Sequence, residues 1–481
     1  MKILVVGGGT AGLISALILK KFLNTQVDVV SSEKIGIIGV GEGSTEHFTD
    51  FLNFMGLDKF SILQECDATF KSGVMFENWT SNSYLHSVIT PFNTKQGMYP
   101  IIYSKQISEG LDELSPICYR ENKINSWFVN NKKDIPFLQY HFNTYKLNSF
   151  LTKTANNYNI NTINDEIKNV TFKENGEIDY LTGEKQNYKY DFYVDATGFQ
   201  RLLIGKMGAK WISFSKYLKM KSAIVFPSQD EDEYNLWTLS KAMNCGWRFK
   251  IPTWGRHGNG YIFDSDYITA DQAKEELDKE FGYDVEIKKE FKFDPGYLEN
   301  VWIKNCVAVG LSGSFVEPLE ATSIGSTIQQ SYLLMHKLLN YSDKEINTYN
   351  KNFQSIMENI RDFIALHYVV KKNTTLFWKD MQNIELPDSL QNNLEIWKNK
   401  IPIREDFNNQ SNYCLFWEDN FTLVINGLGL FNQNSIKKEY NLLNQTIKNF
   451  ADKTLLDYKN IEKNSKYIGH KEYVHLTKKY L

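Results

Sequence analysis

The sequence has few cysteines, no long hydrophobic run and no excess of one charge. Its five cysteines form no Cys-x-x-Cys pair, so neither a disulfide framework nor a metal site is expected, and a reducing cytoplasm fits. The 54 Lys and Arg against 57 Asp and Glu give a net charge of −3, which argues against a nucleic-acid binder or an anionic-membrane binder. No apolar stretch approaches the roughly 18 residues of a membrane helix. A strand-like run begins at once, so no signal peptide is expected.

Aromatic residues, in contrast, are abundant, at 14% of 481 residues. A chain of this length can bury a large core and form either two to three domain-sized units or one large domain with an appendage. From about 165 to 290, short strand-like runs alternate with turn residues, and Asn175-Gly176 predicts a tight hairpin. Helical spacing dominates from about Thr322. We expect an α/β core over residues 1–340, with a mixed substrate-side sheet, and a mainly helical cap over residues 341–481.

The N-terminal segment predicts a βαβ unit with a glycine-rich turn. Residues 2–7 form an apolar run, an apolar helical pattern continues to Leu23, and residues 26–31 form the next strand-like run. The turn between them has the pattern of a dinucleotide-binding site, whose glycines allow a tight turn, close approach of a pyrophosphate and close packing of the helix. A glycine turn in an unrelated α/β protein is the alternative. The candidate residues are Gly7, Gly9, Thr10, Ala11 and Gly12.

The residue that contacts the ribose is open between two candidates. An acidic residue is expected at the end of the second strand, about 20 residues after the turn. Ser31 occupies that position, and Glu33 is the nearest carboxylate. Glu33 either reaches the ribose or is a solvated loop charge.

A second strand, over residues 191–195, ends in Asp195-Ala196-Thr197-Gly198. This ending recurs in flavoproteins with two dinucleotide-binding domains, where small residues pass close to the cofactor. Two such segments favour FAD over NAD. The alternative is an ordinary glycine between a strand and a loop.

Four further stretches resemble the flavin-dependent tryptophan halogenase family. They are GIIGVGEGSTEHF (36–48), TFKSGVMFENW (69–79), AMNCGWRFKIPTWGRHGNGYIF (242–263) and NCVAVGLSGSFVEPLEATSIGS (305–326). With the two glycine motifs, the resemblance runs from residue 1 to about 380 in the same order. It implies an FAD-binding fold like that of the flavin monooxygenases.

The resemblance also implies a mechanism in two places. In the family, reduced flavin and O₂ give a hydroperoxide, halide converts it to hypohalous acid, and this oxidant passes through a tunnel to a lysine, matched by Lys71. The lysine hydrogen-bonds the oxidant or becomes a haloamine, which requires an enclosed, apolar place such as Phe70, Phe76 and Trp79 would supply.

The family's catalytic glutamate is matched by Glu320, which stabilises the arenium cation and takes its proton. A carboxylate facing a helix dipole is a compatible reading of the same residue. The family's halide site carries over to Thr322 and Ser323. Ser323 stands where the family has glycine, so the halide preference is left open among chloride, bromide and iodide.

The resemblance assigns two more groups of residues. The barrier between flavin and substrate is matched by Trp247, Phe249, Ile251 and Pro252, with Phe249 in place of a second tryptophan. These residues could equally be ordinary core. Further flavin contacts are assigned to Gly39, Val40, Gly41, Glu42, Gly310, Leu311 and Ile324.

The resemblance fails at the family's aromatic substrate lid. The corresponding stretch, 407–429, is shorter and does not align with the residues that grip free tryptophan, so Tyr413, Phe416 and Trp417 either line a pocket or belong to the core. We therefore expect a small electron-rich aromatic substrate, such as an indole or a phenol. A separate flavin reductase is the expected partner, and the sequence leaves the oligomeric state open, a homo-oligomer included.

Two other functions compete with halogenation. A flavin hydroxylase usually has a Gly-Asp pair where this chain has Gly310-Leu311, and it carries an internal Asp-Gly motif that is not found here. A catalytically silent flavoprotein would not need both Lys71 and Glu320.

Overall fold

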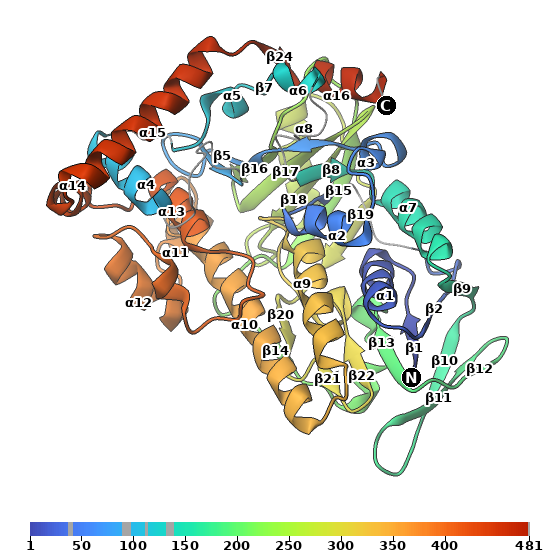
Figure 1. Cartoon of the computed structure of the whole chain (residues 1–481). Helices are drawn as coiled ribbons and strands as arrows, with labels where there is room; N and C mark the ends of the chain where they lie inside the picture. The colour runs from blue at the N-terminus through green and yellow to red at the C-terminus, as the bar shows by residue number, and fades with distance from the viewer. Residues whose placement is uncertain (37–41, 89–97, 111–113, 131–138, 480–481) are drawn as a thin grey trace.

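The computed structural model describes residues 1–36, 42–88, 98–110, 114–130 and 139–479 (Figure 1). A six-stranded sheet forms its N-terminal layer, in the order β21-β22-β13-β1-β2-β9. Its strands are parallel except for β21, which pairs antiparallel with β22. Their bounds are β1 Lys2–Val6, β2 Gln26–Ser31, β9 Asn161–Asn164, β13 Phe192–Asp195, β21 Trp302–Ile303 and β22 Cys306–Ala308. The predicted βαβ start is confirmed, with helix α1 over Thr10–Phe22.

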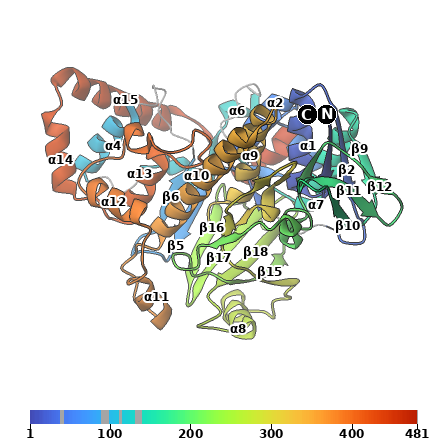
Figure 2. The ribbon, with the colours of Figure 1, turned by 90° about the horizontal axis from the view of Figure 1, so that it is seen from below.

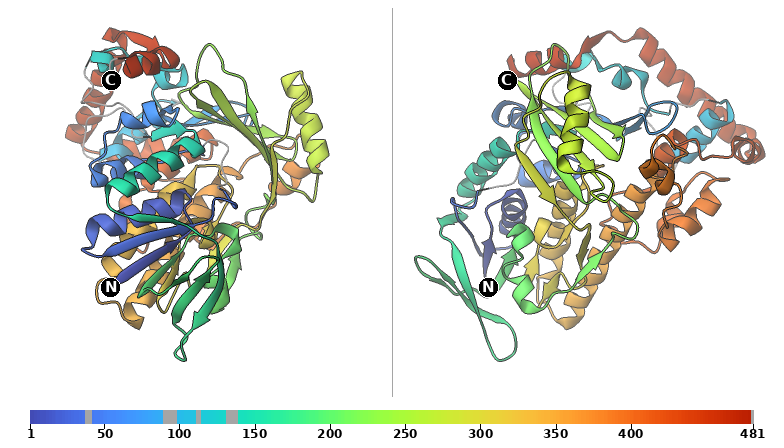
Figure 3. Two further views of the ribbon diagram at one scale, coloured as in Figure 1. Left: turned by 90° about the vertical axis from the view of Figure 1, so that its right-hand side faces the viewer. Right: turned by 180° about the vertical axis from the view of Figure 1, so that it is seen from behind.

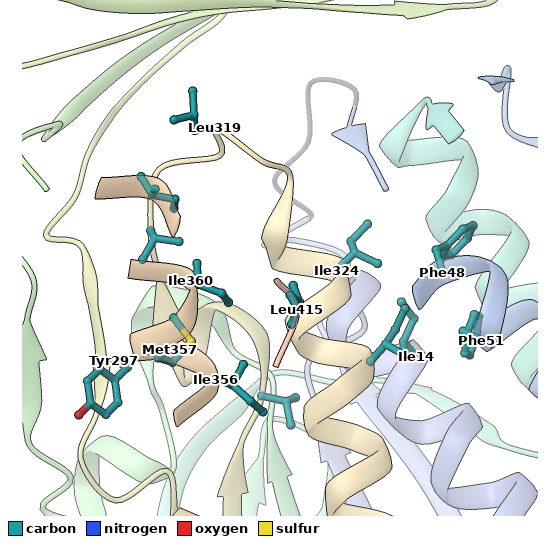
Figure 4. Packing of buried hydrophobic residues seen from close by; sticks show 14 of the residues in the cluster. Ile14, Phe48, Phe51, Tyr297, Leu319, Ile324, Ile356, Met357, Ile360 and Leu415 are labelled. Carbon is teal, nitrogen blue, oxygen red and sulfur yellow. The ribbon is translucent and has the colours of Figure 1, made fainter. Parts of the chain in front are cut away.

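Helices α1, α7 (Thr144–Asn157) and α9 (Thr322–Lys337) pack beside this sheet. Ser15 of α1 and Ser331 of α9 hydrogen-bond at 2.8 Å in the buried contact between their helices. Figure 4 shows the same region of the core, where Ile14 of α1 and Ile324 of α9 point toward each other and Leu415 lies beside α9. This packing places the start of α9 next to the glycine-rich turn.

The second layer is a mixed seven-stranded sheet in the order β19-β15-β18-β17-β16-β5-β6. The pair β5–β16 is parallel and the others are antiparallel. The strands are β5 Gly73–Glu77, β6 Tyr84–Ser87, β15 Ser222–Ser228, β16 Thr238–Met243, β17 Gly246–Thr253, β18 Arg256–Phe263 and β19 Lys289–Lys292. Helix α8 (Ala270–Phe281) covers its outer face (Figure 3). The sequence analysis did not predict this helix, although a capping box of Thr269 and Gln272 marks its start.

Four small sheets complete the described strands, in the orders β3-β8-β4, β10-β11-β12, β14-β20-β23 and β24-β7. The sheet β3-β8-β4 carries Lys71 at its end, with bounds β3 Glu42–Gly43, β4 Thr69–Lys71 and β8 Gln139–Phe142. The hairpin of β10 (Ile167–Phe172) and β11 (Ile178–Gly183) confirms the turn predicted at Asn175-Gly176, where Gly176 has φ +82°. The remaining short elements are β12 Asn187–Tyr188, β14 Trp211–Ser213, β20 Gly296–Leu298, β23 Ser314–Phe315, α2 His47–Met55, α3 Ser61–Glu65, α5 Ile117–Arg120 and α6 Trp127–Asn130.

The C-terminal region is mainly helical, as predicted, and its helices α12, α14 and α15 stand to one side of the sheets (Figure 2). Its elements are α10 Asp343–His367, α11 Leu376–Met381, α12 Asp388–Trp397, α13 Glu418–Gly427, α14 Gln433–Leu442, α15 Gln445–Asn464, β24 Tyr467–Gly469 and α16 His470–Lys479. Helix α4 (Tyr99–Ser108), from earlier in the chain, packs against α14 and α15 around a separate small core. Strand β24 pairs with β7 (Lys123–Asn125), which returns the chain to the sheets.

No helix within the described residues is long and apolar enough to cross a membrane.

Candidate functional site

A cavity of about 490 Å³ lies at the carboxyl ends of β1, β2 and β13. Ligands of open α/β sheets bind at this edge, where helix N-termini point toward them. The cavity brings together most of the residues that the sequence assigns to the flavin. These are Gly7, Gly9, Thr10, Ala11, Ser31, Glu42, Thr197, Gly198, Leu311 and Ile324, with the expected halide residue Ser323.

The glycine-rich turn leaves no room for side chains at two positions. Gly7 has φ +118°, and a Cβ there would lie 2.2 Å from the carbonyl oxygen of Ala196. A Cβ on Gly12 would lie 2.0 Å from the carbonyl oxygen of Gly7. At Gly9 nothing lies within 4 Å of such a Cβ, so this glycine keeps open the space beside the helix start.

Two helix N-termini face the cavity. No side chain caps α1 or α9, and neither has an acidic residue in its first turn. Residues from both starts line the cavity, so their free N–H groups and positive dipole ends lie near it. Ala321, which precedes α9, has φ +54° and turns the chain sharply into the helix. The residues therefore fit a large anionic ligand such as the pyrophosphate of FAD.

Of the described residues assigned to the flavin or halide, five do not line the cavity. Asp195 is buried behind it and accepts hydrogen bonds from the N–H groups of Thr197, Leu203 and Ile204; it shapes the loop that follows β13. Gly310 packs against Ala11 of α1, where a Cβ would lie 2.5 Å from the alanine Cβ. The others are Gly12, Glu33, which is exposed, and Thr322, which is buried.

The cavity wall beside Ser31 includes acidic residues that the sequence analysis did not single out. Ser31 and Ser32 line the cavity. So do Asp165 and Glu166, which follow the neighbouring strand β9. The Asp165 carboxylate accepts a hydrogen bond from the Tyr188 hydroxyl at 2.7 Å. No sequence motif marks these residues, because β9 follows a long excursion of the chain away from β2.

The segment expected to pass close to the flavin is described only in part. Gly39, Val40 and Gly41 lie outside the described residues. Glu42 lines the cavity, and burial raises the pKa of its carboxyl from 4.5 to about 7.

Lys71 is buried at the end of β4, and its Nζ donates a hydrogen bond to the Ser44 carbonyl oxygen at 2.9 Å. Burial lowers the pKa of Lys71 to about 8, and the charges of Glu320 and Glu46 oppose this shift. The amine and the ammonium are therefore both accessible near neutral pH. Phe70, Phe76 and Trp79 are fully buried, as an enclosed apolar place requires.

Glu320 is buried between two histidines of distant segments. His86 Nδ1, on β6, lies 3.0 and 2.9 Å from its two oxygens, and His367 Nε2, at the end of α10, lies 2.9 Å from Oε1. Burial raises the pKa of this carboxyl, but the charge and hydrogen bonds of His86 and His367 outweigh burial and lower it to about 2. Neither histidine was predicted from the sequence.

Both candidate catalytic residues lie next to segments that line the cavity. Glu42 lines it, and two residues later the Ser44 carbonyl receives the Lys71 ammonium. Ser323 lines it, and Glu320 lies three residues earlier on the opposite side of the turn at Ala321. The charge of Glu320 reaches Lys71. Short stretches of backbone thus connect the cavity wall to each of the two residues.

The four barrier candidates lie along β17 and are buried. The Trp247 indole N–H donates to Glu317 Oε2 at 2.7 Å, and the Tyr368 hydroxyl donates to the same oxygen at 2.7 Å. Phe249 packs 6.2 Å from Trp247, between ring centroids. Ile251 and Pro252 continue the strand, and the Pro252 carbonyl accepts from the Thr69 hydroxyl on the strand of Lys71. None of the four lines the described cavity, so their role as a barrier stays a prediction.

The C-terminal aromatics belong to the core of the cap. Phe416 stacks on Phe363 of α10 with ring centroids 3.9 Å apart. The Arg404 guanidinium lies over Trp417, 3.3 Å from its ring centroid. Tyr413 is half-buried and packs against the same core. In the part of the chain that the structure describes, no group of three or more His, Cys, Asp or Glu side chains is placed to hold a metal.

Comparisons with known proteins place this geometry in a family. The tryptophan halogenase family model matches residues 2–440. The chain is 29% identical to 7-chloro-L-tryptophan 6-halogenase KtzR of Kutzneria sp. (strain 744), over 83% of this chain and 86% of KtzR. It is 28% identical to tryptophan 7-halogenase RebH of Lentzea aerocolonigenes, over 89% of both. The structure of Tar14, a tryptophan C-6 flavin-dependent halogenase from taromycin biosynthesis, superposes with a TM-score of 0.88 at 26% identity, over 99% of both chains. The expected flavoprotein fold is confirmed, and the chain belongs to the tryptophan halogenase family of flavin-dependent enzymes.

Proposed function

We propose that this enzyme halogenates a small electron-rich aromatic compound, with FAD in the cavity and Lys71 and Glu320 as its catalytic residues. One observation carries the proposal most directly. The two buried residues of opposite charge lie on segments that continue from the walls of the flavin cavity. Reduced FAD, when bound, supplies the chemistry that activates O₂ and oxidises a halide ion.

Lys71 holds the hypohalous acid. Its Nζ is fixed by the Ser44 carbonyl, and its lowered pKa allows it to donate a hydrogen bond as an ammonium or to accept the halogen as an amine. The uncapped start of α9, at Thr322 and Ser323, offers N–H groups to the halide. The choice among chloride, bromide and iodide is left to the assay.

Glu320 acts on the ring once the carbon–halogen bond has formed. Its carboxylate stabilises the positive charge of the arenium ion, and it then accepts the proton as the C–H electron pair returns to the ring. The low pKa of Glu320 keeps this carboxylate ionised. An arenium ion is acidic enough to protonate it.

The substrate is an indole or a phenol, with free tryptophan as the alternative. KtzR, RebH and Tar14 are named for tryptophan or chlorotryptophan. In this chain Phe416 and Trp417 pack against Phe363 and Arg404, and Asn420 of α13 faces His86. These side chains are engaged within the protein, so they are not free to hold an amino-acid backbone.

A separate flavin reductase delivers the reduced FAD by diffusion. The five cysteines are unpaired, which suits a reducing cytoplasm where such a partner operates.

The test compares wild type with Lys71→Ala, with a reductase, NADH, O₂ and bromide supplied, over a panel of indoles, phenols and tryptophan. Wild type should give brominated product. Lys71→Ala should give none, while O₂ still oxidises the reduced flavin and is itself reduced to hydrogen peroxide. Lys279→Ala, a change at an exposed lysine of α8, is the matched control and should keep full activity. Equal product from Lys71→Ala and wild type would exclude the role of Lys71. Preferred turnover of free tryptophan would exclude the substrate assignment.

A further inference from the structure

The carboxylate of Glu320 lies within hydrogen-bond distance of ring nitrogens from two histidines, His86 and His367. No sequence motif marks either histidine. The three side chains are 3% (Glu320), 1% (His86) and 0% (His367) exposed. They come from the loop before α9, from β6 and from the end of α10. A carboxylate buried to this extent is costly unless its charge is compensated. The positions of the protons in this cluster therefore decide what Glu320 can do.

The partners of His367 fix one of its protons. Its Nδ1 lies 2.9 Å from the Phe363 carbonyl oxygen, one turn earlier in α10. A carbonyl oxygen only accepts, so Nδ1 carries a proton. Its Nε2 lies 2.9 Å from Glu320 Oε1. One proton must lie between these two atoms, on the nitrogen or on the oxygen.

The partners of His86 fix its tautomer differently. The Oδ1 of Asn420 accepts from the Trp417 backbone N–H at 2.8 Å, which sets the orientation of the amide. The Nδ2 of Asn420 then faces His86 Nε2 at 3.3 Å. Because an amide NH₂ only donates, His86 Nε2 is bare and the proton is on Nδ1, directed at Glu320. His86 is a neutral donor.

We propose that His367 is a positioning residue for the step catalysed by Glu320: it is an imidazolium, protonated on both nitrogens, that forms a buried ion pair with the carboxylate, while His86 is a neutral donor that fixes its orientation. This inference rests on the proposed function of Glu320. It assigns different roles to two residues that contact the same carboxylate.

Phe76 is the aromatic neighbour that distinguishes the two histidines. Its ring lies 4.5 Å from that of His367, within the range of cation–π attraction. Phe363 lies 5.1 Å from His367 and 5.2 Å from His86, both in T-shaped contacts, and favours neither. An ionised Glu320 with a charged His367 and a neutral His86 is a neutral group, as its burial requires. The other titratable groups whose charges couple to Glu320 are Lys71 and Tyr84.

The resting enzyme tests the proton positions without any turnover. Nitrogen-15 NMR of histidine-labelled protein at pH 8, where an ordinary imidazole is neutral, should show one histidine with protons on both ring nitrogens. That signal should disappear in His367→Gln. A spectrum in which every histidine has one bare nitrogen would overturn the proposal, even if the enzyme halogenates its substrate.

The pH dependence of halogenation separates the two histidines. His367→Gln and His86→Asn each replace an imidazole by a neutral amide donor near the same atom. Loss of an adjacent positive charge raises the pKa of a carboxyl by about 1–3 units. In His367→Gln the pH at which kcat falls on the acid side should therefore rise by about the same amount, with KM little changed. This pH should not move in His86→Asn. An equal shift in both variants, or none in His367→Gln, would refute the assignment. An inactive wild type would instead refute the proposed function.

Discussion

Glu317 is a buried carboxyl whose replacement by glutamine should change the pH dependence of stability. Both of its hydrogen-bond donors, the Trp247 N–H and the Tyr368 hydroxyl, are directed at Oε2, and its Oε1 is buried with no partner among the described residues. This is the pattern of a neutral acid whose carbonyl oxygen accepts two bonds. Glutamine has the same shape and an amide oxygen in the place of Oε2.

The size of the effect follows from the pKa. Burial raises the pKa of Glu317 from 4.5 to about 7, although Tyr368 and Trp247 oppose this shift. Between these two values the folded protein binds more protons than the unfolded chain, so wild type loses stability as the pH rises through this window. At about 1.4 kcal/mol per pKa unit, the loss is about 3 kcal/mol. With an unfolding entropy of about 1 kcal/mol per kelvin for a chain of this size, it corresponds to about 3 °C in Tm.

Thermal unfolding of wild type and Glu317→Gln at pH 5 and pH 8 measures the effect. The Tm of the variant relative to wild type should be about 3 °C higher at pH 8 than at pH 5. Glu42 and Asp419, whose pKa values are also raised to about 7, are common to both proteins and cancel. Glu317→Leu should be destabilised at both pH values, by about 1–3 kcal/mol for each donor left unpaired. A difference in Tm that does not change with pH would show that Glu317 is ionised throughout.

Three further predictions concern the cofactor and Lys71. Gly12→Ala should lower Tm and abolish FAD binding, because the added Cβ would lie 2.0 Å from the Gly7 carbonyl oxygen. Gly9→Ala should keep the Tm of wild type, since nothing lies within 4 Å of its added Cβ. Calorimetry and flavin titration check both variants. Ser31→Ala should weaken FAD binding about fivefold, the value of one hydrogen bond, and Glu33→Ala should leave it unchanged; equal losses would reopen the choice between them. Halogenation should change in rate through about pH 8 as Lys71 titrates, rising if the amine reacts and falling if the ammonium does; a rate that is flat from pH 7 to pH 9 would contradict this.

Local patterns predicted the parts of the site that lie within single segments. The glycine turn, the strand before Asp195 and the helix after Ala321 are each defined by neighbouring residues, and the structure gathers most of them at one cavity. Asp195 shows the limit of this approach. Its carboxylate does not line the cavity and instead accepts hydrogen bonds from the backbone of residues 197–204.

Contacts between distant segments could not be predicted in this way. His86, Glu320, His367 and Asn420 meet only because β6, the loop before α9, α10 and α13 converge. A single histidine in a strand or at a helix end has no local signature. Helix α8 was missed for a different reason, because its charged sequence is short and lies among strand-like runs.

The pairing of β24 with β7 has a consequence for the order of assembly. It brings His470 to the strand of Lys71, where Nε2 accepts from the Phe70 backbone N–H at 3.1 Å and Tyr473 packs on the Phe70 ring. Burial lowers the pKa of His470 to about 4, so this nitrogen remains an acceptor. The strand of Lys71 is therefore completed only after the ribosome has synthesised residues 467–479. Until then Phe70, the neighbour of Lys71, lacks the acceptor and the aromatic ring that hold it in the folded protein.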